Sequence, residues 1–263
     1  MLKIRQYIKA QTLDEAYELC QKKGTVVLGG MLWLKMQNST VPAAVDLCDL
    51  GLDTIEETDE EYRIGAMVPL RALETHPGIN AMTQNAMAHC LAPIIGVQFR
   101  NLATIGGSIW GRFGFSDPLT LFLALGAKVE LHHAGVMTLE EFLGFTGKDI
   151  LVRVLLPKAS VQVSYLSQRN TATDFPVLTC AVCRSAAGTL CAVGARPGRA
   201  ALYRDEQNIL AGGITKDTAA AYAEQLADAA DFGSNLRASG EYRRRICKVL
   251  VLRALMACKE GNC

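Results

Sequence analysis

The spacing of hydrophobic residues near the start of the chain predicts a helix followed by a strand. Thr12 and Glu15 form a capping-box pattern that opens a helix over residues 12–20. The apolar run 26–28 then predicts a strand that ends at the double glycine 29–30. Ligands bind at the ends of strands in many α/β arrangements, so this double glycine is a candidate binding loop.

The pattern after residue 52 predicts a second lobe of mixed structure. The expected elements are strands over 62–66 and 128–132, helices over 69–73 and 80–90, a loop over 100–109, and a short helix capped at Thr138. Residues 116–118 read as a turn before the apolar run 119–125. Together these elements predict an α+β fold.

A different pattern follows residue 158. Alternating residues predict an antiparallel meander of strands over 161–168, 177–185 and 189–194, and two helices are expected over 216–230 and 239–258. We therefore predict two domains, 1–158 and 159–263, the first with lobes of about 1–51 and 52–158.

Composition narrows the class of protein. The chain has 263 residues, 50% hydrophobic and 20% charged, with a net charge of +1. This balance gives no electrostatic case for nucleic acid or an anionic membrane as partner. No apolar run approaches the roughly 20 residues of a membrane helix, and nine scattered cysteines are typical of reduced thiols, so a cytoplasmic location is expected.

Two local patterns have competing interpretations. Cys180 and Cys183 form a C-x-x-C, but a strand sends residues three apart to opposite faces, which favours core cysteines over a metal or redox pair. The basic run 243–245 lies on a helix whose apolar stripe is expected to be Tyr242, Ile246, Val249 and Leu250. We interpret the run as a solvated face or a partner contact.

The candidate chemistry lies in two glycine pairs. Thr104 precedes Gly106 and Gly107, and the earlier pair is Gly29 and Gly30. Glycines without a Cβ let backbone N–H groups approach a bulky anion, so two such loops could clamp a dinucleotide. Neither loop matches G-x-G-x-x-G or a P-loop. The histidines accompany no triad or H-E-x-x-H motif, and we assign no catalytic or metal residue.

The order and spacing of these motifs resemble the FAD-binding medium subunit of the molybdenum hydroxylases, the xanthine dehydrogenase and carbon monoxide dehydrogenase family. The segment 100–109 reads RNLATIGGSI and is followed by Ser116-Asp117, while 28–30 reads LGG. Near the end, 235–244 reads NLRASGEYRR and is similar to the family's D-x-R-A-S-x-x-Y-R. The resemblance covers essentially the whole chain.

This resemblance implies a two-lobed FAD-binding domain of the PCMH or vanillyl-alcohol-oxidase type, followed by a smaller C-terminal domain with an antiparallel sheet and helices. It implies that FAD contacts two segments and two further residues: Val26, Val27, Leu28, Gly29, Gly30, Met31, Leu32 and Trp33; Thr104, Ile105, Gly106, Gly107 and Ser108; and Asp117 and Leu151. The glycines, with the hydroxyls of Thr104 and Ser108, are expected to supply donors. Asp117 also fits the role of a turn former.

The family's activity implies that electrons pass from a 2Fe-2S small subunit through FAD to NAD, while a molybdopterin-binding large subunit hydroxylates the substrate. Met31 and Ser167 stand where the family has a polar residue and often a lysine. A stand-alone flavin oxidoreductase and a flavin-free scaffold therefore remain alternatives. Trp110, Phe113 and Phe115 fit either stacking on the cofactor or packing between lobes.

Overall fold

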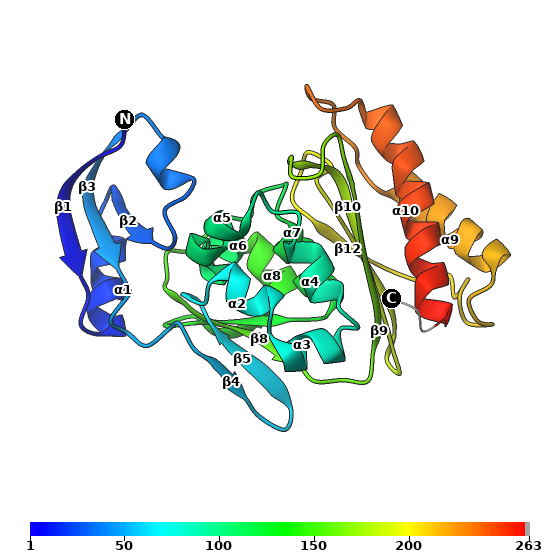
Figure 1. Cartoon of the computed structure of the whole chain (residues 1–263), viewed down its shortest axis with the longest axis horizontal. Helices are drawn as coiled ribbons and strands as arrows, with labels where there is room; N and C mark the ends of the chain where they lie inside the picture. Colours follow the sequence, from blue (N-terminus) through cyan, green and yellow to red (C-terminus); the bar gives the residue numbers. More distant parts are fainter. Residues whose placement is uncertain (261–263) are drawn as a thin grey trace. The chain divides into compact units, whose positions relative to one another are not determined.

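The computed structural model describes residues 1–260 and divides into two compact units (Figure 1). The first unit contains residues 1–72, 97–111 and 127–157, and the second contains 73–96, 112–126 and the chain from 158 onward. Helices and sheets occur in both units, which confirms the α+β class. The units are discontinuous in sequence, so the division at residue 158 and the two lobes stay predictions about folding domains.

A parallel three-stranded sheet forms one part of the first unit. Its order is β1 (Lys3–Lys9), β3 (Thr40–Asp46) and β2 (Thr25–Leu28), and a short 3-10 turn follows at Leu34–Met36. Helix α1 (Leu13–Gln21) connects β1 to β2, and the Thr12 hydroxyl accepts a hydrogen bond from the Glu15 N–H at 3.1 Å. The predicted cap and strand are confirmed, and β2 leads directly into Gly29.

An antiparallel five-stranded sheet forms the other part of the first unit. Its order is β4 (Ile55–Glu57), β5 (Glu61–Gly65), β8 (Leu151–Pro157), β6 (Lys128–Leu131) and β7 (Gly135–Thr138). The helices are α5 (Val97–Leu102), α6 (Ile105–Trp110) and α8 (Leu139–Gly144), and α2 (Leu70–Glu74) begins here. Helix α6 contacts β8. The expected capping box at Thr138 is present.

The second unit is built around the predicted meander. Its sheet runs β9 (Gln162–Arg169), β10 (Pro176–Ser185), β11 (Gly188–Gly194) and β12 (Ala201–Arg204). Helices α9 (Lys216–Ala229) and α10 (Gly240–Glu260) cover one face, and α4 (Ala86–Leu91) and α7 (Asp117–Ala124) cover the other (Figure 1). Since β10 packs on both faces, nearly all its side chains are buried.

Two predictions in the middle of the chain were wrong. The single helix over 80–90 is split into α3 (Pro77–Met82) and α4, because Gln84 and Asn85 adopt left-handed conformations with φ of 53° and 65°. The loop over 100–109 is instead the end of α5 and most of α6, separated by Ala103 and Thr104. The glycine pair therefore lies inside the first turn of a helix.

The basic run 243–245 was also misread in part. Arg243 is buried, and α10 turns Cys247 and Leu250 inward while Tyr242 and Val249 are exposed. Of the predicted stripe, Ile246 and Leu250 pack against the core, whereas Tyr242 and Val249 do not. Among the described residues, no helix is both long and apolar enough to cross a membrane.

Candidate functional site

The two glycine loops lie against each other within the first unit. A Cβ atom placed on Gly30 would lie 1.9 Å from the carbonyl oxygen of Leu102, and one on Gly29 would lie 2.7 Å from Thr104 Oγ1. Such distances are far below van der Waals contact, so any side chain at these positions would push the loops apart. The two glycine pairs are therefore neighbours in the fold, and their sharing one binding site stays a prediction.

The second loop is held by hydrogen bonds inside the protein. The N–H groups of Ile105 and Gly106 donate to the carbonyls of Val68 and Ala66 at 2.9 and 2.8 Å. The Thr104 hydroxyl accepts from the Gly107 N–H, and the Ser108 hydroxyl donates to the Thr104 carbonyl. The N–H groups of Ile105, Gly106 and Gly107 and the Ser108 hydroxyl thus already donate within the protein, whereas the Thr104 hydroxyl only accepts. The main contribution of this loop is a close and rigid wall.

The first loop presents a different situation. Within the described chain, the N–H groups of Gly29, Gly30, Met31 and Leu32 donate to no other residue. Met31 is left-handed with φ of 60°, a conformation that is uncommon for a methionine and bends the backbone sharply. Consecutive unpaired N–H groups around a left-handed residue form a concave group suited to an anion.

The remaining residues of the first segment differ in their exposure. Leu28 and Leu32 are buried, Val26 is half-buried and Val27 is partly exposed. The Trp33 ring packs on Phe99 of α5, with ring centroids 5.7 Å apart. The segment is therefore anchored by apolar contacts on both sides of its open amides.

Leu151 begins β8 and is buried, opposite Leu131 in the antiparallel pairing with β6. The predicted contact of Leu151 with the cofactor stays a prediction, as do the roles of the other predicted site residues.

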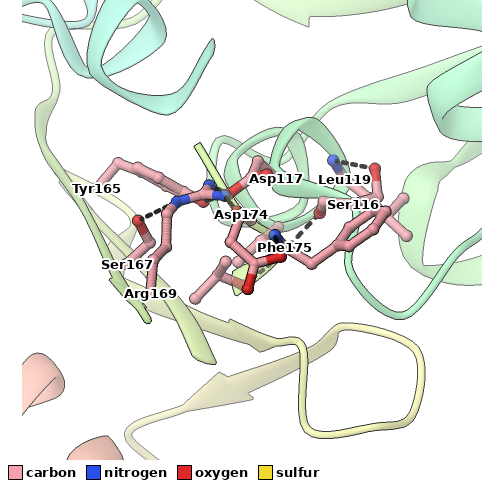
Figure 2. A network of polar contacts seen from close by, with 10 residues as sticks. Ser116, Asp117, Leu119, Tyr165, Ser167, Arg169, Asp174 and Phe175 are labelled. Carbon is pink, nitrogen blue, oxygen red and sulfur yellow. Dashed lines mark hydrogen bonds and ion pairs between the residues drawn. The ribbon is translucent and has the colours of Figure 1, made fainter. Parts of the chain in front are cut away.

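Asp117 belongs to the second unit, where it forms a buried polar cluster. It is the first residue of α7, and its carboxylate accepts hydrogen bonds from the Tyr165 hydroxyl and the Arg169 guanidinium, both on β9 (Figure 2). Burial raises the pKa of the Asp117 carboxyl, while Arg169 and Tyr165 oppose that rise. The Arg169 guanidinium also donates to the Asp174 carbonyl and to Ser167 Oγ.

This cluster was not foreseen from the sequence. Residues two apart on a strand share a face, so the alternation of β9 places Tyr165, Ser167 and Arg169 together. This two-residue alternation, together with the carboxylate of Asp117 earlier in the chain, was the sequence signal from which the cluster could have been predicted. The cluster gives Asp117 a structural role, and its contact with a cofactor stays a prediction.

Trp110 ends α6, Phe113 and Phe115 follow it, and each of the three rings contacts another ring of its own unit. The Trp110 ring lies on Phe142, with centroids 5.6 Å apart, in the first unit. In the second unit Phe115 stacks on Phe113 at 5.1 Å and packs on Phe175 at 4.5 Å. These contacts are packing contacts.

The cysteine prediction is confirmed. Cys180 and Cys183 are buried on opposite faces of β10, and burial raises the pKa of Cys183 to about 11. The Cys180 and Cys191 sulfur atoms are 4.0 Å apart and remain thiols. A buried thiol with a raised pKa is a poor nucleophile and a poor metal ligand at neutral pH.

The chain is similar to several known proteins. The chain is 26% identical over 272 residues to the nicotine 6-hydroxylase medium subunit of Paenarthrobacter nicotinovorans, with 95% of each covered. Carbon monoxide dehydrogenase from Hydrogenophaga pseudoflava has a similar fold, with a TM-score of 0.84 at 23% identity, covering 98% of each chain. Quinoline 2-oxidoreductase from Pseudomonas putida gives a TM-score of 0.83 at 21% identity, covering 98% of this chain and 97% of that one.

The family described as the FAD binding domain in molybdopterin dehydrogenase matches residues 2–159, which include both glycine loops. The two solved structures establish the fold alone, whereas the family match covers more than half of the chain. The chain belongs to this family of FAD-binding domains, and FAD is its cofactor.

Proposed function

We propose that the FAD diphosphate binds in the first unit, on the open amides of Gly29–Leu32 and beside the wall formed by Thr104–Ser108. The observation that carries this proposal is the run of unpaired N–H groups in a segment whose glycines, Gly29 and Gly30, lie too close to the second loop to carry a side chain. Four amides that lack protein acceptors can donate to phosphate oxygens without breaking an existing bond. The residues present therefore suit a diphosphate.

The flavin supplies the redox chemistry, and the protein supplies binding and orientation. In this proposal the glycines admit the diphosphate closely, and the left-handed Met31 keeps the amides pointing to one side. The wall at Thr104 is fixed by its own hydrogen bonds and so holds its distance. Met31 retains the amide that an anion needs, although it lacks a polar side chain.

We further propose that the chain is the electron-transfer subunit of a molybdenum-hydroxylase complex. Electrons would enter from a 2Fe-2S small subunit and leave to NAD, as in xanthine dehydrogenase, while a molybdopterin-binding large subunit oxidises the substrate. This role is supported by the similarity to the nicotine 6-hydroxylase medium subunit, which extends over 95% of both chains. Seven of the eight described cysteines are buried thiols, which supports iron–sulfur clusters held by a partner.

We place the complex in the cytoplasm. The free thiols of the described cysteines, including the pair Cys180 and Cys191 at 4.0 Å, are consistent with a reducing compartment.

The first experiment is an absorbance spectrum of the purified full chain, before and after addition of NADH without oxygen. We expect flavin bands that bleach with NADH. A chain that stays colourless after incubation with FAD would favour a flavin-free scaffold. Flavin bands that NADH does not bleach would show that FAD is bound and would reject NAD as the electron acceptor. Bleaching by an oxidisable small molecule, without a partner subunit, would favour a stand-alone oxidoreductase.

A further inference from the structure

Three side chains with metal-ligating atoms gather on the first unit, apart from the glycine loops. They are Asp14 of α1 and His132 and His133 of the turn between β6 and β7, and one ligand atom of each lies within 4.8 Å of the others. We propose that Asp14, His132 and His133 bind a divalent transition-metal ion of the zinc type.

The local backbone explains how two consecutive histidines serve one site. Successive residues of a regular strand point to opposite faces, which would separate the two rings. Strand β6 ends at Leu131, and its pairing with β8 shifts register between Glu130 and Leu131. The two imidazoles consequently lie near each other, with ring centroids 4.8 Å apart and planes at 82°.

The turn that carries the histidines is firmly held. The His132 N–H donates to the Ile150 carbonyl at 2.9 Å. The buried carboxylate of Asp149 accepts from the His133 N–H at 3.1 Å and the Ala134 N–H at 2.8 Å. The Tyr17 ring stacks on His133, with centroids 3.6 Å apart. These contacts hold the backbone that carries the ligands, which lowers the cost of binding, while the ligand atoms, within 4.8 Å of one another, close around the ion by side-chain rotation.

Asp14 supplies the adaptable ligand. Its Oδ1 lies 2.7 Å from His132 Nε2, and its side chain is 80% exposed. Ligand atoms around a tetrahedral zinc ion are about 3.3 Å apart, given metal–ligand bonds of about 2.0–2.1 Å. A metal ion would replace the proton that Asp14 Oδ1 and His132 Nε2 now share. The distance between these two atoms would then have to increase by about 0.6 Å, which the exposed carboxylate can do by rotating. Water would take the fourth position.

The donor set selects the class of metal. Two imidazole nitrogens with one carboxylate oxygen suit Zn²⁺ and its transition-metal neighbours, whereas Mg²⁺ and Ca²⁺ prefer oxygen ligands. A bound ion would connect α1 to the β6–β7 turn. Because α1 contacts β2, and β2 ends at Leu28 directly before Gly29, the ion would stabilise the sheet that carries the first glycine loop.

The test uses the full chain, without a polyhistidine tag, in a Cys48→Ser, Cys263→Ser background. Cys48 is the exposed cysteine of the described chain, and Cys263 lies outside the described residues. Titration with Zn²⁺ after treatment with a chelator is expected to show one ion bound per chain. Co²⁺ is expected to give visible d–d bands without thiolate charge-transfer bands.

Asp14→Asn and His133→Ala should each weaken Zn²⁺ binding at least about tenfold. The matched control is His89→Ala, because His89 is an exposed histidine away from the cluster, and this variant should bind Zn²⁺ as the unchanged chain does. Asp14→Asn keeps the shape of an exposed side chain, so it remains informative if His133→Ala fails to fold without its contact with Tyr17. Zn²⁺ binding that does not saturate at one ion, or that is unchanged in Asp14→Asn, would overturn the proposal.

Discussion

Gly107 differs from the other glycines of the two loops in what surrounds it. A Cβ on Gly30 or Gly106 would lie 1.9 or 2.5 Å from a backbone oxygen, so substitution there would disturb the fold itself. A Cβ on Gly107 would meet only Thr104 Oγ1, at 3.2 Å. A side chain at Gly107 can therefore be accommodated by the protein while it enters the space beside Gly29.

We predict that Gly107→Val abolishes retention of FAD and leaves a folded protein. The added isopropyl group would occupy the region in which we place the diphosphate, while the internal hydrogen bonds of α6 stay in place. Flavin absorbance after gel filtration measures retention, and circular dichroism measures the fold.

The matched control is Gly144→Val, since Gly144 lies in α8 of the same unit and a Cβ atom there would meet nothing within 4 Å. It should keep its flavin. A Gly107→Val protein as yellow as the unchanged chain would show that the diphosphate lies elsewhere.

Single residues also show where the sequence stops being informative. The glycine pairs were identifiable because glycine is the one residue that fits so close an approach. The open amides could not be identified from the sequence, because Thr104–Ser108 and Gly29–Leu32 both look like glycine loops. Only tertiary contacts decide which of their N–H groups are already hydrogen-bonded.

At the scale of elements, strong local signals predicted the structure well. The N-cap at Thr12, the capping box at Thr138 and the alternating strands of the meander each correspond to an observed element. The helix over 80–90 failed because its apolar period continues through Gln84 and Asn85, whose left-handed conformations no periodicity reports. The helices around Ala103 were missed because paired glycines are typical of loops.

Helix α7 is joined to β9 by the contact of Asp117 with Arg169, and both side chains are less than 10% exposed. We predict that Asp117→Asn lowers the free energy of unfolding by about 3 kcal/mol, because Arg169 keeps a buried charge without its partner. Denaturant unfolding measures the loss. The double variant Asp117→Asn, Arg169→Met should lose less than the single variant, since it removes both charges.

The exposed carboxylate of Asp228, which pairs with Arg244, provides the control, and Asp228→Asn should unfold as the unchanged chain does. The same Asp117→Asn protein tests the cofactor role. If the folded Asp117→Asn protein binds FAD with the same dissociation constant as the unchanged chain, then Asp117 stabilises the fold and does not contact the cofactor.

At the scale of the whole molecule, the chain topology brings distant segments together. Each compact unit takes three separate stretches of sequence, and β8 is inserted between β5 and β6 in its sheet. Local patterns carry no information about this order, which is why the sequence placed one boundary at residue 158. Local patterns were sufficient for the α+β class and for the suggestion that the two glycine loops act together, and the resemblance to a family added the identity of the cofactor.

The three arginines at 243–245 show how the whole fold decides the role of identical residues. The Arg243 guanidinium is buried and donates to the carbonyls of Val177, Gly233 and Ala238 and to Asn235 Oδ1, at distances of 2.6 to 2.9 Å. Arg245 is exposed and pairs with Glu241 on the same helix. The pattern of charges led to the same interpretation for both residues.

We predict that Arg243→Ala lowers the free energy of unfolding by at least about 3 kcal/mol, because four acceptors around a buried charge lose their donor. Arg245→Ala, in the same helix and with the same change of charge, should leave the denaturant midpoint unchanged, since exposed ion pairs contribute little. Urea unfolding of the two variants side by side measures the difference. Equal midpoints would mean that water replaces the Arg243 guanidinium without cost, and that α10 is held by its apolar face alone.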